Sequence, residues 1–258
     1  MAHTNRESPD TLDSNNIILS NFLYKGGDDC VAIKPRSYNV ELLNITCHDG
    51  NNIAIGSVGQ YLEDSSVYNI RADNVTAYGT EFGAYIKTWV GKLLPQPSYE
   101  SAFQPRGAGW GNVRNILFSN FKLVGAQLAT AITQDSGDNG TFPGTSLMTV
   151  SNVAFVNFTG YVNTTGAANT SVVNDISCSG VNPCYGITYD NFNVSNLNSQ
   201  TEITTCQYTR AGGVFGVNCT QGQSGCPLGA CGQAVAGGGP TPMKRGLGFL
   251  QKGYKHEQ

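Results

Sequence analysis

The stretch YKGGDDCVAIKP, residues 24–35, places two aspartates side by side between two glycines and a short apolar segment. Asp28 and Asp29 stand out because only 13% of the chain is Asp, Glu, Lys or Arg. Adjacent carboxylates repel each other, which raises the pKa of one of them and lets it hold a proton for general acid catalysis. The alternative is an ordinary exposed turn, in which Gly and Asp are both common. The elements that position the pair decide between these interpretations.

The composition limits the classes of protein. The chain has 258 residues, enough for one large all-β domain, and its abundant Asn, Ser, Thr and Gly suit a solvent-facing sheet. The formal net charge of −3, without a basic tract, argues against nucleic acid as a partner. No apolar run is long enough to cross a bilayer, so we expect no membrane partner. The three histidines are too scattered for a metal site, and nothing implies a metal ion or cofactor.

Cysteines and glycosylation acceptors together indicate a secreted protein. An even count of eight cysteines is compatible with disulfides. The acceptor pattern Asn-x-Ser/Thr also occurs eight times, and the two features together favour an extracellular location. The start, MAHTNRESPD, contains no apolar signal segment. We therefore expect a fragment, or a chain that lacks its true beginning.

A pattern of Asn, apolar residue, three further residues, Asn and apolar residue recurs along the chain. It begins at positions 16, 39, 69, 115 and 152, and a sixth copy, at 186, has Gly in the first place. The copies begin 23, 30, 46, 37 and 34 residues apart, as in a solenoid of stacked β coils with loops of variable length. A β-sandwich would instead show strands roughly 8–12 residues apart with hairpin turns between them. We predict an all-β, right-handed parallel β-helix with the second Asn of each copy at equivalent corners.

A second set of strands places the two aspartates. The segments at 30–34, 52–57 and 84–88 follow the first three copies at matching offsets, so they should stack in a parallel sheet about 4.8 Å apart. This stacking puts a set of polar side chains on one edge of neighbouring coils: Asp10, Asp13, Asp28, Asp29, Asn51, Asn52, Tyr85 and Lys87. The acidic pair is therefore expected in a groove.

Three motifs in this order carry a resemblance to a known family. GGDDCVAIKP, GNNIAIGSVGQY and YIKTW resemble the pectin-degrading polygalacturonase family, glycoside hydrolase family 28, over roughly residues 5–200. The resemblance implies a right-handed parallel β-helix that hydrolyses galacturonan or rhamnogalacturonan with inversion. It also implies that Asp28 is the general acid and that Asp29 helps to activate water. The base is implied to come from NRESPDT, where the family's NTDGxDT-like motif falls on Glu7 and Asp10.

Two departures from the family pattern bear on the substrate. Asn51 occupies the position of a histidine of polygalacturonases, and Tyr85 replaces the Arg of their RIK motif, whose Lys remains as Lys87. Tyr offers a stacking face and one hydroxyl instead of a bidentate fork for a uronate carboxylate. Both changes favour an exo-acting or rhamnogalacturonan-directed member, and GQY after the strand resembles exo-acting fungal members. Asn51, Asn52, Tyr85 and Lys87 are the candidate substrate-binding residues.

We predict a secreted exo-polygalacturonase that acts on a pectic polysaccharide or oligosaccharide as a monomer, without a cofactor. An exo-acting rhamnogalacturonan hydrolase or α-L-rhamnosidase of the same family is the alternative. A non-catalytic carbohydrate-binding solenoid, or an inactive fragment, is the alternative from another class. A pectate lyase is disfavoured, because it would need a calcium-binding carboxylate cluster and an arginine base.

The remaining features concern the frame of the protein. Cys30 pairs with Cys47 about one coil away, and Cys178 with Cys184 across a short loop, whereas the pairing of the last four cysteines stays open. Trp89 and Trp110 either line sugar subsites or anchor the packing. We expect residues 1–221 to form the hydrolase domain, truncated at its N-terminus, and residues 222–258 to form a Gly/Pro-rich, partly disordered tail.

Overall fold

Every coil of the chain contributes one strand to each of two parallel sheets. The computed structural model describes residues 8–94, 105–136, 142–164, 171–198 and 201–221, and these contain β-strands but no helix. The odd-numbered strands form one sheet, in the order β1 (Asp10–Thr11), β3 (Asp29–Ile33), β5 (Asn52–Val58), β7 (Phe82–Trp89), β9 (Leu128–Ser136), β11 (Val172–Ser177), β13 (Ile203–Gln207) and β15 (Cys219–Gln221). The even-numbered strands form the other, in the order β2 (Asn15–Lys25), β4 (Ser37–His48), β6 (Val67–Tyr78), β8 (Trp110–Ala126), β10 (Leu147–Val162), β12 (Tyr185–Asn196) and β14 (Val214–Phe215).

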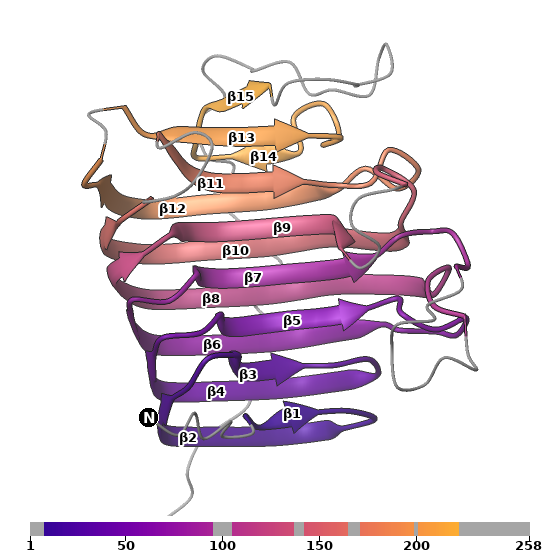
Figure 1. Ribbon diagram of the computed structural model, residues 1–258, viewed down its shortest axis with the longest axis horizontal. Helices are drawn as coiled ribbons and strands as arrows, with labels where there is room; N and C mark the ends of the chain where they lie inside the picture. Colours follow the sequence, from indigo (N-terminus) through magenta and orange to yellow (C-terminus); the bar gives the residue numbers. More distant parts are fainter. Residues whose placement is uncertain (1–7, 95–104, 137–141, 165–170, 199–200, 222–258) are drawn as a thin grey trace, which may run out of the picture.

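The two sheets lie one behind the other and rise together along the molecule, as the stacked ribbons of Figure 1 show. The predicted right-handed parallel β-helix is confirmed. Within the described ranges, no helix has the length and hydrophobicity to cross a membrane. The chain continues as strand up to β15, at the last described residues, and the predicted tail at 222–258 lies outside them.

The repeated asparagines are the corners of the coils, as predicted. All six copies of the pattern lie in the even-numbered strands β2 to β12, and every Asn at either of its two Asn positions has φ between +48° and +59°. This left-handed conformation is costly for most residues and is tolerated by Asn and Gly. The sixth copy begins with Gly186, at φ +67°, so Gly replaces Asn where the backbone demands the same conformation.

The corner side chains also bond from coil to coil. At the first corner, Asn69 Nδ2 donates to Asn39 Oδ1 at 2.9 Å, and Asn69 Oδ1 accepts from Asn115 Nδ2 at 3.1 Å. A similar ladder runs along the second corner, where Asn74 Nδ2 donates to Asn44 Oδ1 at 2.7 Å. An Asn such as Asn69 therefore serves both the bend of its own coil and the register with its neighbours.

The interior is filled by columns of like side chains. Ile33, Ile55, Ile86, Ile132 and Ile176 occupy successive strands in register, and each is at most 1% exposed. Aromatic stacks fill the other side, such as Phe118 on Phe155 with ring centroids 5.4 Å apart. Each fully buried Ile or Phe contributes about 1.5–3 kcal/mol through burial of apolar surface. The core is therefore continuous from coil to coil.

Three disulfides fasten the described coils. The predicted pairs Cys30–Cys47 and Cys178–Cys184 are confirmed. The structure adds Cys206–Cys219, a pairing that the sequence left open, between β13 and β15. Cys226 and Cys231 lie outside the described residues.

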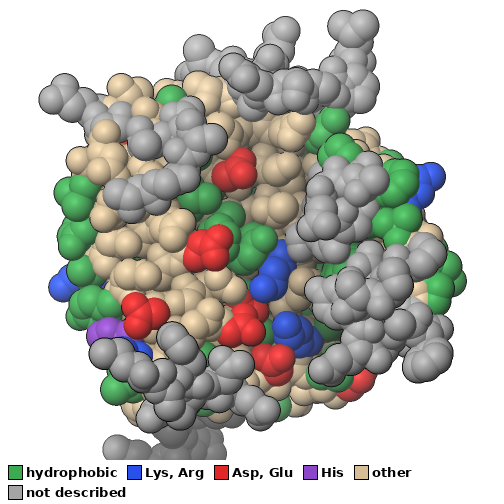
Figure 2. Space-filling view, in the orientation of Figure 1, with side chains coloured by type: hydrophobic (Ala, Val, Ile, Leu, Met, Phe, Trp, Pro, Cys, Tyr) green, Lys and Arg blue, Asp and Glu red, His purple; other side chains and the backbone are tan. Residues whose placement is uncertain are grey.

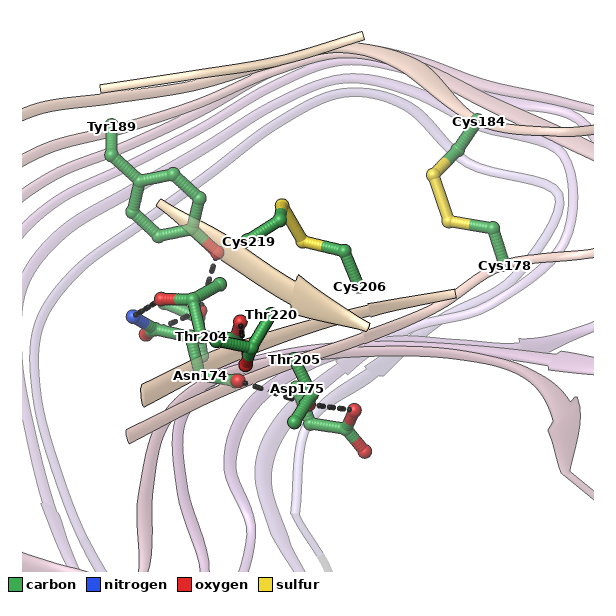
Figure 3. The surroundings of a disulfide bond; sticks show 11 residues. Asn174, Asp175, Cys178, Cys184, Tyr189, Thr204, Thr205, Cys206, Cys219 and Thr220 are labelled. Atoms are coloured by element: carbon green, nitrogen blue, oxygen red, sulfur yellow. Dashed lines mark hydrogen bonds between the residues drawn. A yellow bond between two sulfur atoms is a disulfide. The ribbon is translucent and has the colours of Figure 1, made fainter. Parts of the chain in front are cut away.

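A buried polar chain lies near the last disulfide (Figure 3). Thr130 Oγ1 donates to Asn174 Oδ1 at 2.8 Å, so the Tyr189 hydroxyl, 2.8 Å from Thr130 Oγ1, is the donor to it. Asn174 Nδ2 then donates to Thr204 Oγ1 at 3.1 Å. Burial raises the pKa of the Tyr189 hydroxyl, which keeps it a neutral donor. Polar side chains therefore enter this part of the core with their hydrogen bonds made.

The corner conformation and the ladder can be separated by substitution at Asn69. Asn69→Ala should lower the free energy of unfolding by about 2–3 kcal/mol, because Ala pays about 1–2 kcal/mol in the left-handed region and both ladder bonds are lost. Asn69→Gly should lower it by about 1 kcal/mol less, since Gly adopts the conformation freely. Urea unfolding measures both, with Asn112→Ala, at an exposed Asn outside the ladder, as the control. Equal losses for Ala and Gly would contradict the conformational role.

Candidate active site

The two adjacent aspartates differ in their surroundings. Asp29 is the first residue of β3 and is 3% exposed, whereas Asp28 precedes the strand and is exposed. Asp28 Oδ1 accepts a hydrogen bond of 2.7 Å from the backbone N–H of Asp29. The start of β3 thus separates the two carboxylates, with Asp29 buried in the sheet and Asp28 at the surface before it.

Two donor groups from two later coils hold the Asp29 carboxylate through three hydrogen bonds. Asn51 Nδ2 donates to Asp29 Oδ1 at 3.0 Å, and Lys87 Nζ lies 3.2 and 3.0 Å from Oδ1 and Oδ2. A charge as buried as this one needs a partner, because desolvation otherwise disfavours the ionised form. The Lys87 ammonium is that partner. Because it is already paired with Asp29, it is not available to bind the carboxylate of a uronate.

Glycines let these coils approach closely enough. Lys87 lies on β7, two strands from Asp29, and must pass the strand between them. A Cβ at Gly56 of β5 would lie 2.2 Å from the Lys87 carbonyl oxygen and 2.7 Å from its Cγ. A Cβ at Gly50 would lie 2.1 Å from the Asp28 carbonyl oxygen, and Gly50 has φ +67°. Sequence reasoning assigned no role to Gly56, although a Gly inside a strand signals a close approach of this kind.

Asp10 joins the group from the preceding coil, as expected. It pairs in register with Ala32 on β3, and its carboxylate lies 3.8 Å from Lys34 Nζ. Burial raises the pKa of the Asp10 carboxyl. The charge of Lys34 lowers this pKa, and the charges of Asp29 and Asp28 raise it. Glu7, the other predicted base residue, lies outside the described residues.

Tyr85 lies on β7, two residues before Lys87, and is only partly exposed. Its ring stacks on Phe82 with centroids 4.0 Å apart, and Lys87 Nζ is 5.3 Å from its centroid. Burial raises the pKa of the Tyr85 hydroxyl, while its hydrogen bond with Thr133 acts in the opposite direction. Tyr85 therefore offers a neutral hydroxyl and a ring edge where the family pattern has a cation.

The structure corrects the interpretation of Asn52 as a substrate-binding residue. Asn52 is fully buried, has φ +62°, and its amide donates to the Gly83 carbonyl oxygen. Its side chain thus supports the bend into β5 and does not reach the groove. Asn51, one residue earlier, is the amide that contacts Asp29.

Both tryptophans lie apart from the carboxylates. Trp89, 4% exposed, belongs to the packing, whereas Trp110, at the start of β8, is 53% exposed. A surface depression of about 370 Å³ is lined by Tyr61 of the GQY motif, Leu62, Glu63, Leu93 and Pro105, and by none of the predicted site residues. Within the described ranges, no group of three or more His, Cys, Asp or Glu is placed to hold a metal ion.

Charged side chains gather on the outer face of the odd-numbered sheet. Figure 2 shows acidic side chains running across this face, with basic side chains beside them. The acids that interact here by charge or contact are Asp10, Asp28 and Asp29, with Lys34 and Lys87 as their cationic partners. A carboxylate set of this kind, on one face and on neighbouring coils, suits acid–base chemistry.

The sequence matches the family described as Glycosyl hydrolases family 28 over residues 2–214. The chain belongs to glycosyl hydrolase family 28. A relative named "Putative galacturan 1,4-alpha-galacturonidase C", from Aspergillus niger, is 56% identical over 220 residues, which cover 83% of this chain and 51% of that protein. An exopolygalacturonase from Cochliobolus carbonum is 34% identical over 223 residues, which cover 84% of this chain and 47% of that protein.

A solved structure of the same family type shares the fold. The endo-xylogalacturonan hydrolase from Aspergillus tubingensis matches with a TM-score of 0.60 at 26% identity, over 82% of this chain and 52% of that one. This family 28 chain therefore spans about half the length of the relatives it matches. The resemblance stated from the three motifs is confirmed at the level of family and fold.

The ion pair between Lys87 and Asp29 should stabilise the coils that it joins. Lys87→Met removes the partner of a buried carboxylate and should lower the free energy of unfolding by about 3 kcal/mol. Adding Asp29→Asn should recover most of that loss, because the uncompensated charge is removed. Urea unfolding of both single variants and the double variant measures the coupling. A double variant less stable than Lys87→Met alone would contradict the pairing.

Stability near Asp10 should depend on pH. Because its pKa is raised above 3.8, the folded chain binds this proton more readily than the unfolded chain does. The resulting stabilisation is present at low pH and is lost as pH rises through the folded-state pKa. Asp10→Asn should therefore raise Tm at pH 7 and leave it unchanged at pH 3. Asp190→Asn, at an exposed residue of β12, is the control. A Tm lowered at pH 7 would contradict the raised pKa.

Proposed function

We propose that this family 28 member hydrolyses glycosidic bonds in pectin as an exo-polygalacturonase that releases terminal galacturonate with inversion. The observation that carries the proposal is the pair at the edge of β3, with Asp28 exposed and Asp29 held by Lys87 and Asn51. The galacturonidase and exopolygalacturonase names of the relatives support the exo mode and the substrate.

Asp28 is the general acid in this mechanism. Its exposed carboxyl group, fixed by the N–H of Asp29, can reach a glycosidic oxygen lying in the groove. It donates its proton to that oxygen as the bond to the anomeric carbon breaks, so the leaving sugar departs as a neutral alcohol.

Asp29 and a carboxylate of the preceding coil activate the water. Lys87 and Asn51 hold the Asp29 carboxylate in place, so it can accept a hydrogen bond from a water on the opposite face of the sugar. Asp10, or Glu7, takes the proton that the water loses as its oxygen attacks the anomeric carbon. An inverting enzyme needs its acid and base about 6.5–9.5 Å apart, which carboxylates from neighbouring coils can provide.

Tyr85 favours a second candidate, an exo-acting rhamnogalacturonan hydrolase or α-L-rhamnosidase. Neither Tyr85 nor the committed Lys87 offers a free cation to a uronate. A non-catalytic carbohydrate-binding solenoid is the candidate from another class, because Glu7 stands where the family pattern has Asp. It would bind pectic chains and release no product.

The setting of the protein follows from the same chemistry. We propose a pectic polysaccharide or oligosaccharide as the partner, a monomeric state and an extracellular location. Three disulfides among the described residues suit an oxidising compartment, and the glycosylation acceptor sequences point the same way.

Replacing the acid tests the function. Asp28→Asn should lower kcat by about 10²–10⁴-fold, because the amide cannot donate the proton that the leaving oxygen needs. Tm should stay within about one degree, since an Asn oxygen can still accept from the N–H of Asp29 and exposed substitutions change little. The measurement is chromatography of products from polygalacturonate and, separately, from rhamnogalacturonan oligomers.

The products decide among the candidates. Monomeric galacturonate from polygalacturonate supports the exo-polygalacturonase, and rhamnose or rhamnogalacturonan fragments alone support the second candidate. Full activity in Asp28→Asn would refute its role as the acid, and binding without any product would favour the non-catalytic solenoid.

A further inference from the structure

The outer face of the odd-numbered sheet continues well beyond the carboxylates of the candidate active site. One row of paired residues runs from Tyr85 through Ala131 and Asp175 to Thr205. A parallel row runs from Lys87 through Thr133 and Ser177 to Gln207. At about 4.8 Å per strand, Asp175 lies roughly 10 Å along the groove from Tyr85.

Asp175 faces the groove and not the core. Figure 3 shows its carboxylate on the other side of the strands from Tyr189 and the disulfides. Its neighbours in sequence, Asn174 and Ile176, are 2% and 1% exposed and point inward, whereas Asp175 is partly exposed. The alternation of strand side chains thus makes Asp175 a surface group of the groove wall.

One oxygen of the Asp175 carboxylate accepts a hydrogen bond from Thr205, and the other is available to a ligand. Thr205 Oγ1 donates to Asp175 Oδ1 at 2.7 Å and thereby fixes its orientation. Oδ2 has no hydrogen-bond or ion-pair partner among the described residues. Burial raises the pKa of the Asp175 carboxyl, while the hydrogen bond from Thr205 acts in the opposite direction. In its ionised form the carboxylate only accepts hydrogen bonds, so a ligand of Oδ2 is then a donor such as a sugar hydroxyl.

Among the described residues, no cation is paired with Asp175. The two rows carry no Lys or Arg beyond Lys87, which is itself paired with Asp29 at 3.0 Å. Hydroxyl and amide side chains surround Asp175 instead, among them Thr133, Ser177 and Gln207. A uronate bound here would meet a like charge without compensation.

We propose that Asp175 makes this end of the groove select an uncharged sugar unit, such as a methyl-esterified galacturonate or a neutral sugar, over a free galacturonate. Asp175 Oδ2 accepts from a hydroxyl of that unit, and Thr205 keeps the carboxylate in place. The inference rests on the proposed function in taking the groove as the binding site of a pectic chain. At this position an uncharged unit then binds more tightly than the free galacturonate of polygalacturonate, which still binds there more weakly.

Binding of matched oligomers tests the role of Asp175. The probes are tetragalacturonate with free carboxylates and its fully methyl-esterified form, titrated calorimetrically at pH 7 and low salt. All proteins carry Asp28→Asn, so that turnover does not consume the probe. The parent should bind the ester at least fivefold more tightly than the free acid. Asp175→Asn should bring the ratio of the two dissociation constants below twofold, because the free acid then binds more tightly. The isosteric amide keeps the bond from Thr205 and loses the charge.

Asp190→Asn is the matched control, since it removes one negative charge from an exposed residue of β12 on the other sheet. It should leave the ratio unchanged, and all variants should keep the Tm of the parent. The inference is overturned by an unchanged ratio in Asp175→Asn, by tighter binding of the free acid to the parent, or by binding of neither oligomer. A further outcome is that the protein prefers the ester through Asp175 and yet, without Asp28→Asn, hydrolyses no pectic oligomer. That result would support the inference and count against the proposed function.

Discussion

The register between successive coils is the constraint on which the rest of this structure depends. A parallel sheet fixes the spacing between strands at about 4.8 Å, and a slip of one residue would turn every side chain to the opposite face. The asparagine corners resist such a slip in two ways. Their left-handed φ fixes where each coil bends, and their amides bond to the coil below, as Asn69 does to Asn39. Burial of the isoleucine column in the core stabilises the same register.

With the register fixed, residues far apart in sequence become neighbours in the groove. Asp29 and Lys87 are 58 positions apart and meet only because β3, β5 and β7 stack in order. The distance between them is spanned by a long flexible side chain that passes a strand where Gly56 leaves room. The charge of Asp29 is thus compensated by a residue two coils away. The site is therefore formed by several stacked coils together, and no single coil contains it.

The same stacking sorts charge along the groove. At one end, Asp10, Asp28 and Asp29 are accompanied by Lys34 and Lys87, whose positive charges offset part of the repulsion between the carboxylates. Further along, Asp175 stands among hydroxyl and amide groups with Thr205 as its partner. Under the proposed function, a pectic chain lying on this face meets the acid–base groups at one position and the Asp175 carboxylate at another.

The sequence by itself determined the fold and predicted which polar residues share one face of it. A repeat whose Asn positions require a left-handed bend, and strands whose offsets agree, leave few alternatives to a parallel β-helix, because only stacked coils satisfy both. The pairing of Cys30 with Cys47 and the gathering of Asp10, Asp28, Asp29, Asn51, Tyr85 and Lys87 on one face followed from the same counting. Only the tertiary structure decided how these side chains are used. It buried Asn52 at a bend, bound Lys87 to Asp29 and left Asp28 exposed, because burial and partners depend on what the neighbouring coils place opposite each residue.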